Sequence, residues 1–196
     1  MEELLTDLKN TSLLEYLGVL TGITYVILAA FKKRICWLFA LISTGIYTWL
    51  CFIGQLYIES SLQVFYFVMA IYGWIKWSND LEKNLPIIRW PLLYHFYNIV
   101  ISSFMATILG YFVSVYTDQS QPYLDAFTTV FSLAATFMIA KRVLENWIYW
   151  ILIDLALFVL YASKGYVLTG IQYGLFSLIA LFALFSWYKF YKAQKV

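Results

Sequence analysis

The sequence predicts an all-α integral membrane protein with seven transmembrane helices. Only 12% of its residues are charged, whereas about a quarter are charged in an ordinary soluble domain. Aromatic residues make up 21% of the chain, and the mean hydropathy is +0.75. A length of 196 residues holds several spans of about 20 residues each and leaves little for a soluble domain. We therefore expect any function to lie among the helices.

Seven apolar segments account for most of the chain. They are expected to be helices, because lipid offers no hydrogen-bond partner to an open backbone and the alternation typical of barrel strands is missing. The turns between segments are very short, except for the polar stretch 78–89. In chain order the segments run over Leu13–Phe31, Ile35–Ile53, Leu56–Trp77, Trp90–Val115, Tyr123–Ala140, Asn146–Ala162 and Tyr166–Tyr188.

Basic residues orient these helices. The N-terminal tail and the loops after the second, fourth and sixth helices hold only Lys9 and Lys164 of the 13 lysines and arginines. The others fall on the opposite side, which the positive-inside rule places in the cytoplasm. The N-terminus is predicted outside and the C-terminus inside, which requires an odd number of spans. The acidic start, with Glu2, Glu3 and Asp7, is unlike a cleavable signal peptide, so we expect this terminus to be retained.

An internal repeat organises the segments. Each repeat holds three helices, and one helix between them keeps the repeats parallel, a 3+1+3 arrangement that one class of transporters uses. The predicted parts are a first repeat over 1–77, a cytoplasmic loop and linker helix over 78–122, and a second repeat with a short tail over 123–196. A shift of 110 residues aligns Glu15 with Asp125, Ala30 with Ala140, Lys32 with Arg142, Trp37 with Trp147, and Trp77 with Trp187.

Asp154 is the most unusual residue of the predicted spans. It lies about eight residues into the sixth segment, roughly 12 Å from its start and close to the bilayer centre. The repeat pairs it with Thr44, and pairs Gln63 of the third segment with Tyr173 of the seventh. A carboxylate at this depth costs about 2.5–3.5 kcal/mol to insert, and no lysine or arginine lies at matching depth to neutralise it. Four helices thus bring polar groups to one layer.

The missing counter-ion has two interpretations. Asp154 is either protonated and bridges two helices by a hydrogen bond, or it binds a positively charged substrate. Aromatic residues nearby favour the second, since a cation gains about 0.5–2 kcal/mol against an aromatic face. Ordinary packing also explains aromatic residues, and an interfacial belt explains Trp37, Trp77 and Trp187 equally well. The aromatic residues on these helices include Tyr47, Tyr66, Trp74, Trp77, Trp147 and Trp150.

Two motifs resemble the signature of the Pnu family of bacterial vitamin transporters. LQVFY at 62–66 and YGWIKW at 72–77 are similar to the LQxxY and YGWxxW pattern of that family. ENWIYW at 145–150, followed by Asp154 and by KGY at 164–166, is similar to the ENWxxW segment of its second half. The resemblance covers nearly the whole chain.

This resemblance implies two parallel three-helix bundles joined by a linker helix, assembled as a homotrimer in the bacterial inner membrane. Members of the family move nicotinamide riboside, thiamine, riboflavin or deoxynucleosides by facilitated diffusion, and a cytoplasmic kinase traps the vitamin. Nicotinamide riboside and thiamine both carry a cationic ring. The size of the family makes nicotinamide riboside the first expectation and thiamine the alternative. Gln55 departs from the family, which often has Gly in that turn. By position the implied contacts are Gln63, Tyr66, Trp74, Asn146, Trp147, Trp150 and Asp154, and the repeat adds Thr44 and Tyr173.

Other classes of protein find less support in the sequence. There is no GxxxxGK[ST] loop, so the chain does not itself use ATP in the P-loop manner. One histidine and two cysteines in apolar surroundings do not suggest a zinc site, and a net charge of +2 does not suggest nucleic-acid binding. A vitamin-capture subunit that needs a separate ATPase stays open as an alternative. An intramembrane enzyme would need a second carboxylate or a metal cluster at the depth of Asp154.

Overall fold

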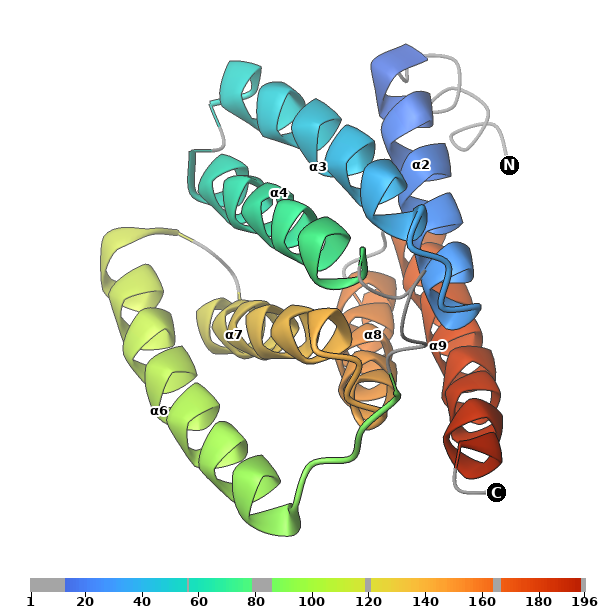
Figure 1. Cartoon of the computed structure of the whole chain (residues 1–196). Coiled ribbons are helices and arrows are strands. Elements are labelled where there is room, and N and C mark those ends of the chain that lie inside the picture. The colour runs from blue at the N-terminus through green and yellow to red at the C-terminus, as the bar shows by residue number, and fades with distance from the viewer. Residues whose placement is uncertain (1–12, 56, 79–85, 119–120, 164–166, 195–196) are drawn as a thin grey trace. The chain divides into compact units, whose positions relative to one another are not determined.

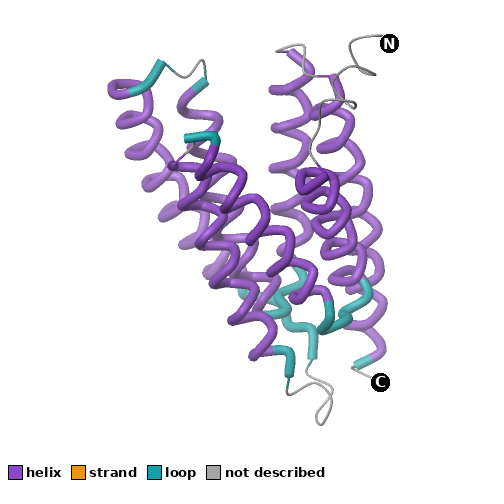
Figure 2. The backbone as a smooth tube through the Cα atoms, turned by 90° about the horizontal axis from the view of Figure 1, so that it is seen from above, coloured by secondary structure: helices purple, strands orange, loops and turns teal. Residues whose placement is uncertain are grey.

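The structure, a computed structural model, describes residues 13–55, 57–78, 86–118, 121–163 and 167–194. These residues form seven α-helices joined by short loops (Figures 1 and 2). The charges of the N-terminal tail, residues 79–85 of the polar stretch and residues 164–166 of the KGY motif fall outside these ranges. The helices are α2 (Leu13–Ala30), α3 (Cys36–Ile53), α4 (Tyr57–Lys76), α6 (Leu92–Tyr116), α7 (Pro122–Ala140), α8 (Asn146–Ser163) and α9 (Val167–Ala193).

The prediction of an all-helical membrane protein is confirmed. Five described helices, namely α2, α3, α6, α7 and most of α9, are long and apolar enough to cross a bilayer. The apolar part of α8 is shorter, and polar residues such as Glu59 and Gln63 make α4 less apolar. Boundaries agree with the predicted segments to within a few residues. The start of α6 differs because Pro91 takes the extended N-cap conformation (ψ 147°), so the helix begins at Leu92 instead of Trp90.

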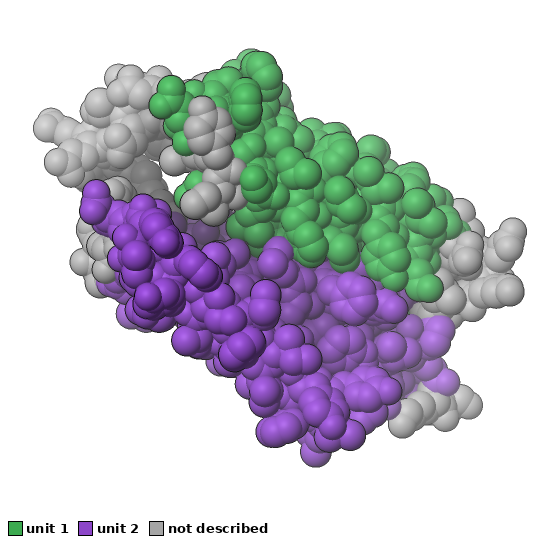
Figure 3. All heavy atoms as spheres, turned by 90° about the vertical axis from the view of Figure 1, so that its left-hand side faces the viewer, with its two compact units in different colours: residues 1–85 green, residues 86–196 purple. Residues whose placement is uncertain are grey.

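Contacts divide the chain into two compact units, residues 1–85 and 86–196, which Figure 3 colours separately. In unit 1, α2 packs on α3 and α3 packs on α4. In unit 2, α6 packs on α7, α7 on α8, and α8 on α9. The division between units lies within the polar stretch 78–89.

The same turn occurs after the first helix of each predicted repeat. Lys32 and Arg142 have φ angles of 56° and 59°, in the left-handed region that ends many helices. The amide groups there donate to carbonyls three and five residues back, which is the Schellman arrangement. Lys32 donates to Ala29 and Lys33 to Leu28, just as Arg142 donates to Ile139 and Val143 to Met138, all at 2.9 Å.

The tryptophans of the repeat pack as two matching pairs. Trp37 meets Trp77 edge to face, with ring centroids 5.4 Å apart and an interplanar angle of 88°. Trp147 meets Trp187 in the same way, at 5.5 Å and 86°. All four side chains are at most 2% exposed. The belt interpretation of Trp37, Trp77 and Trp187 does not fit this burial, because the side chains of an interfacial belt are exposed to lipid and headgroups.

α6 packs on α7 through small residues. Ser102, Ala106 and Gly110 are buried at spacings of four, so they form one stripe along the helix. A Cβ on Gly110 would lie 2.6 Å from Cδ1 of Tyr123, and only glycine permits this approach. Most of the remaining apolar side chains of α6 are exposed.

Candidate functional site

Four predicted site residues lie along one side of α8. Trp147, Trp150 and Asp154 follow one another at spacings of three and four residues, and Asn146 lies beside Trp147. The run from Asn146 to Ser163 contains neither Gly nor Pro, so nothing breaks the helix between these groups. Tyr161 continues the same face seven residues after Asp154. The carboxylate therefore has aromatic residues on both sides along the helix.

Asp154 is buried, with 5% of its surface exposed. In the part of the chain that the structure describes, neither a hydrogen bond nor an ion pair reaches this carboxylate. A buried charge is costly unless an opposite charge or several hydrogen bonds compensate it. The described residues supply no cation to compensate this carboxylate, so a cationic ligand would suit it.

Asn146 and Trp147 open α8 with polar atoms that have no partner. The amide Nδ2 of Asn146 donates to the carbonyl of Val143 at 2.7 Å, while its buried Oδ1 finds no hydrogen bond. The buried Nε1 of Trp147 also lacks one. Buried polar atoms normally have partners, so the acceptor of Asn146 and the donor of Trp147 are available to a ligand.

Tyr173 connects α9 to the same stripe. Its ring stacks on that of Tyr161 of α8, with centroids 5.4 Å apart and an interplanar angle of 12°. Trp150 is half-buried one turn before Asp154. The structure therefore gathers Asn146, Trp150, Asp154 and Tyr173, with Trp147, on the packed pair α8 and α9.

The four remaining predicted residues belong to unit 1. Thr44 of α3 is half-buried and donates its hydroxyl to the carbonyl of Ala40 at 2.7 Å, within its own helix. Gln63 and Tyr66 are half-buried on α4. Trp74 already has a cation against its ring. The guanidinium of Arg34 lies 4.0 Å from the ring centroid, and Nε of Arg34 donates to the Trp74 carbonyl at 3.1 Å.

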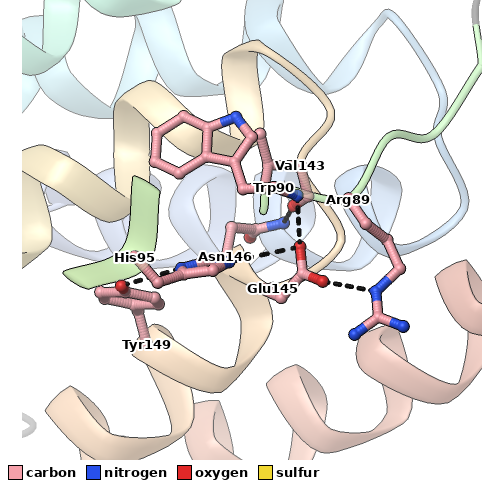
Figure 4. A network of polar contacts seen from close by, with 7 residues as sticks. All are labelled: Arg89, Trp90, His95, Val143, Glu145, Asn146 and Tyr149. Atoms are coloured by element: carbon pink, nitrogen blue, oxygen red, sulfur yellow. Dashed lines mark hydrogen bonds and ion pairs between the residues drawn. The ribbon is translucent and has the colours of Figure 1, made fainter. Parts of the chain in front are cut away.

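Sequence reasoning missed a polar network at the start of α8 (Figure 4). Oε1 of Glu145 accepts a hydrogen bond from Nε of Arg89 at 2.6 Å, and Oε2 accepts the backbone N–H of Trp90 at 3.3 Å. Oε2 also lies 3.8 Å from Nε2 of His95, and a hydrogen bond of 3.1 Å joins Nδ1 of His95 to the hydroxyl of Tyr149. The hydrogen bond to Glu145 raises the pKa of the Arg89 guanidinium above its usual value. Glu145 and Tyr149 stand inside the ENWIYW motif, which was the available signal.

A row of hydroxyl groups on α7 was missed as well. Thr128, Ser132 and Thr136 are buried at spacings of four. Each donates to the carbonyl four residues back, at 2.7–3.0 Å. Such bonds satisfy a hydroxyl within its own helix and leave its oxygen able to accept. The four-residue spacing was the visible signal in the sequence.

The side chains along α8 belong to the types that recognise a cation. A carboxylate and aromatic rings attract a positively charged, flat group, and the free Asn146 and Trp147 atoms offer one acceptor and one donor to its polar edge. Among the described residues, no group of three or more His, Cys, Asp or Glu side chains is placed to hold a metal ion.

Comparisons with known proteins agree with this fold. A family model described as nicotinamide mononucleotide transporter matches residues 12–189. The nicotinamide riboside transporter PnuC of Escherichia coli (strain K12) is 25% identical over 197 residues, which cover 87% of this chain and 82% of that protein. The riboflavin/roseoflavin transporter RibM of Streptomyces davaonensis is 23% identical over 141 residues, or 69% of this chain and 66% of that protein.

A solved structure has the same fold. The crystal structure of the vitamin B3 transporter PnuC superposes with a TM-score of 0.75 and 20% sequence identity. The superposition covers 97% of this chain and 87% of the other.

Proposed function

The chain belongs to the nicotinamide mononucleotide transporter family, and on this basis we propose that it carries nicotinamide riboside across the bacterial inner membrane. As a member of a transporter family it is not an enzyme. The proposed movement is facilitated diffusion down the gradient of the vitamin. A cytoplasmic kinase then adds a phosphate, and the phosphorylated product is retained in the cell.

One observation carries the proposal: Asp154 is buried without a partner among the described residues, on a helix face that also holds Trp147 and Trp150. The pyridinium ring of nicotinamide riboside supplies the missing positive charge and a flat face for the tryptophans. Its carboxamide has a donor and an acceptor, which match Oδ1 of Asn146 and Nε1 of Trp147.

The unphosphorylated riboside suits this face better than the mononucleotide. A phosphate carries up to two negative charges and is normally held by arginine, lysine or backbone N–H groups. The sequence of α8 contains no basic residue, and its one charged side chain is the carboxylate of Asp154. Thiamine, whose thiazolium ring is also a cation, is the alternative substrate.

Several finer features belong to the same proposal. The seven helices span the membrane as two parallel three-helix bundles joined by a linker helix, α6. The N-terminus lies outside and the C-terminus in the cytoplasm, as the basic residues indicate. Gln63, Tyr66, Trp74 and Thr44 of unit 1 are further proposed substrate contacts. The protein assembles as a homotrimer, in which the exposed apolar side chains of α6 meet lipid or another copy.

Uptake into liposomes tests the function directly. The purified full chain, with no other protein present, is expected to equilibrate labelled nicotinamide riboside across the bilayer. Excess unlabelled riboside should block the uptake, whereas excess riboflavin, which has no cationic ring, should leave it nearly unchanged. Liposomes without protein give the background.

The other outcomes identify the alternatives. If thiamine is taken up and the riboside is not, the chain is a thiamine transporter. Binding of a vitamin without any uptake by the chain alone would support the capture subunit that needs a separate ATPase. Failure to bind or move any of these vitamins contradicts the proposed function.

A further inference from the structure

The polar network of Figure 4 fastens a second part of unit 2 to the turn before α8. The N–H of Ile88 donates to the carbonyl of Arg142 at 3.0 Å, and the N–H of Leu144 donates to the carbonyl of Ile88 at 2.8 Å. Together with the bonds from Arg89 and Trp90 to Glu145, they attach three successive residues of segment 86–90 to the turn. The first turn of α8 is thus held from outside its own helix.

Gln194, the residue after α9, binds the same segment through both polar atoms of its side-chain amide. Its Oε1 accepts the N–H of Ile87 at 2.8 Å, and its Nε2 donates to the carbonyl of Ile87 at 3.2 Å. A segment without helical structure of its own thereby obtains partners for its backbone. It joins the beginning of α6 to the turn before α8 and to the end of α9.

Glu145 stands at the centre of these contacts and next to the proposed substrate groups. Its side chain is 9% exposed, while that of Arg89 is 55% exposed. Asn146 and Trp147 follow it directly. Tyr149, one turn later, is held by His95 through the 3.1 Å hydrogen bond and through ring stacking at 5.9 Å. Two fixed points one turn apart determine how α8 is rotated about its axis, and so where Trp147, Trp150 and Asp154 point.

The first repeat has no carboxylate at the position equivalent to Glu145. The position equivalent to Glu145 is Ile35, which is 48% exposed, and the one equivalent to Leu144 is Arg34. Arg34 bonds to Trp74 within unit 1. The carboxylate network therefore occurs in the repeat that carries Asp154, whereas the other repeat has Thr44 at that place. A requirement of turn geometry alone would apply to both repeats.

We propose that Glu145 is a positioning residue for substrate binding: it orients the first turn of α8, and thereby Asn146 and Trp147, by binding Arg89, Trp90 and the region of His95. The expected effect of Glu145 on substrate affinity rests on the proposed transport function. The positioning of the first turn of α8 does not, because it is a property of the protein without substrate. Each part has its own measurement.

Hydrogen exchange of the full chain in detergent tests the positioning without any vitamin. Glu145→Gln keeps the size of the side chain and removes its charge. The amide of Trp90, which donates to this carboxylate, is expected to exchange about tenfold faster, as the loss of a charge-assisted hydrogen bond predicts. The amide of Leu144, which donates to the carbonyl of Ile88, should also exchange faster, because segment 86–90 is then held less firmly against the turn. The amide of Lys33, in the equivalent turn of unit 1, should be unchanged. Equal exchange in variant and wild type at Trp90 and Leu144 overturns the proposal.

Uptake kinetics in liposomes test the consequence. In Glu145→Gln the half-saturating concentration of nicotinamide riboside should rise about tenfold. Tyr149→Phe, which keeps the ring and removes the hydroxyl, should raise it about threefold, and it serves if the first variant does not fold. Asp118→Asn makes the same carboxylate-to-amide change at an exposed residue of unit 2 and should change nothing.

A purely structural role gives a different result. It lowers the maximal rate in step with the amount of folded protein and leaves the half-saturating concentration unaltered, and this outcome overturns the proposal. A wild-type chain that does not move the riboside contradicts the proposed function instead. In that case the same variants are measured with thiamine and riboflavin, and if none is moved, the exchange result alone decides whether Glu145 holds the turn.

Discussion

Asp154 and the residues around it show what one side chain contributes at its position. The carboxylate is 5% exposed, and Trp150 and Tyr161 precede and follow it on the same face of α8. A buried carboxylate without a partner is destabilising, and the pyridinium of the proposed substrate would compensate its charge. That makes the charge, more than the shape of the side chain, the feature to change.

We expect Asp154→Asn to weaken binding of nicotinamide riboside at least tenfold, because the amide has nearly the same size and no charge to pair with the pyridinium. Calorimetry on the purified protein measures the dissociation constant. Asp118→Asn is the matched control, since this exposed carboxylate lies in the same unit. Unchanged affinity for every cationic vitamin in Asp154→Asn would show that the carboxylate is not the counter-ion.

Gly73 offers a residue-scale test of the tryptophan packing. A Cβ at this position would lie 2.3 Å from Cε2 of Trp37, whereas one at Gly45 would lie 3.7 Å from Phe67. Gly73→Ala should therefore destabilise the protein by about 1–3 kcal/mol, the usual effect of overpacking, and Gly45→Ala should be nearly neutral. Thermal unfolding in detergent compares the two. Equal melting temperatures would mean that Trp37 moves aside at little cost.

At the scale of elements, the turns after the first helices of the two repeats have the same backbone conformation. Lys32 and Arg142 hold left-handed conformations, as does Gln55 with φ of 60° between α3 and α4. A glycine adopts this region without strain, which gives a physical reason for the expectation that the family has Gly in this turn. The sequence marked Gln55 as a departure in loop geometry, and the structure supplies the angle.

Gln55→Gly should stabilise the protein by about 1 kcal/mol, which corresponds to a rise of about 2–4 °C in melting temperature for a chain of this size. Gln55→Ala removes the same side chain but keeps the Cβ, so it should not produce the gain. Thermal unfolding in one detergent measures all three proteins. If the alanine variant is as stable as the glycine variant, relief of backbone strain is not the cause.

At the scale of the whole molecule, the distribution of charged residues along the chain predicts its orientation in the membrane. In unit 1, Lys32, Lys33 and Arg34 lie between α2 and α3 and Lys76 ends α4, while Glu15 and Glu59 begin α2 and α4. Consecutive helices alternate in direction, so basic and acidic residues gather at opposite ends of the unit. This asymmetry is the basis of the proposed orientation.

The orientation predicts the outcome of a reporter experiment. A reporter that is active only in the cytoplasm should be active when fused after Val196. The same reporter placed before Leu13 should be inactive, and an epitope there should be accessible on intact spheroplasts. A cytoplasmic signal from both fusions would require an even number of spans and would contradict the proposed topology.

Hydropathy alone located all seven described helices, because a bilayer requires a run of apolar residues at every crossing and such runs are visible without knowledge of contacts. The 110-residue shift aligned Lys32 with Arg142, and the structure shows that both form the same left-handed turn. Asp154 was also recognisable alone, since a carboxylate within an apolar segment is costly wherever its neighbours lie.

Only the tertiary structure decided which polar and aromatic groups already have partners. Arg34 covers Trp74, Trp37 packs on Trp77 in the interior, and Glu145 meets Arg89 across more than fifty positions of the chain. Such contacts depend on how helices are rotated and packed, and hydropathy carries no information about the distance between two side chains. The sequence by itself thus determined the membrane environment, the helices and the buried carboxylate, while the fold decided which residues contact the start of α8 and which buried polar atoms there have no partner.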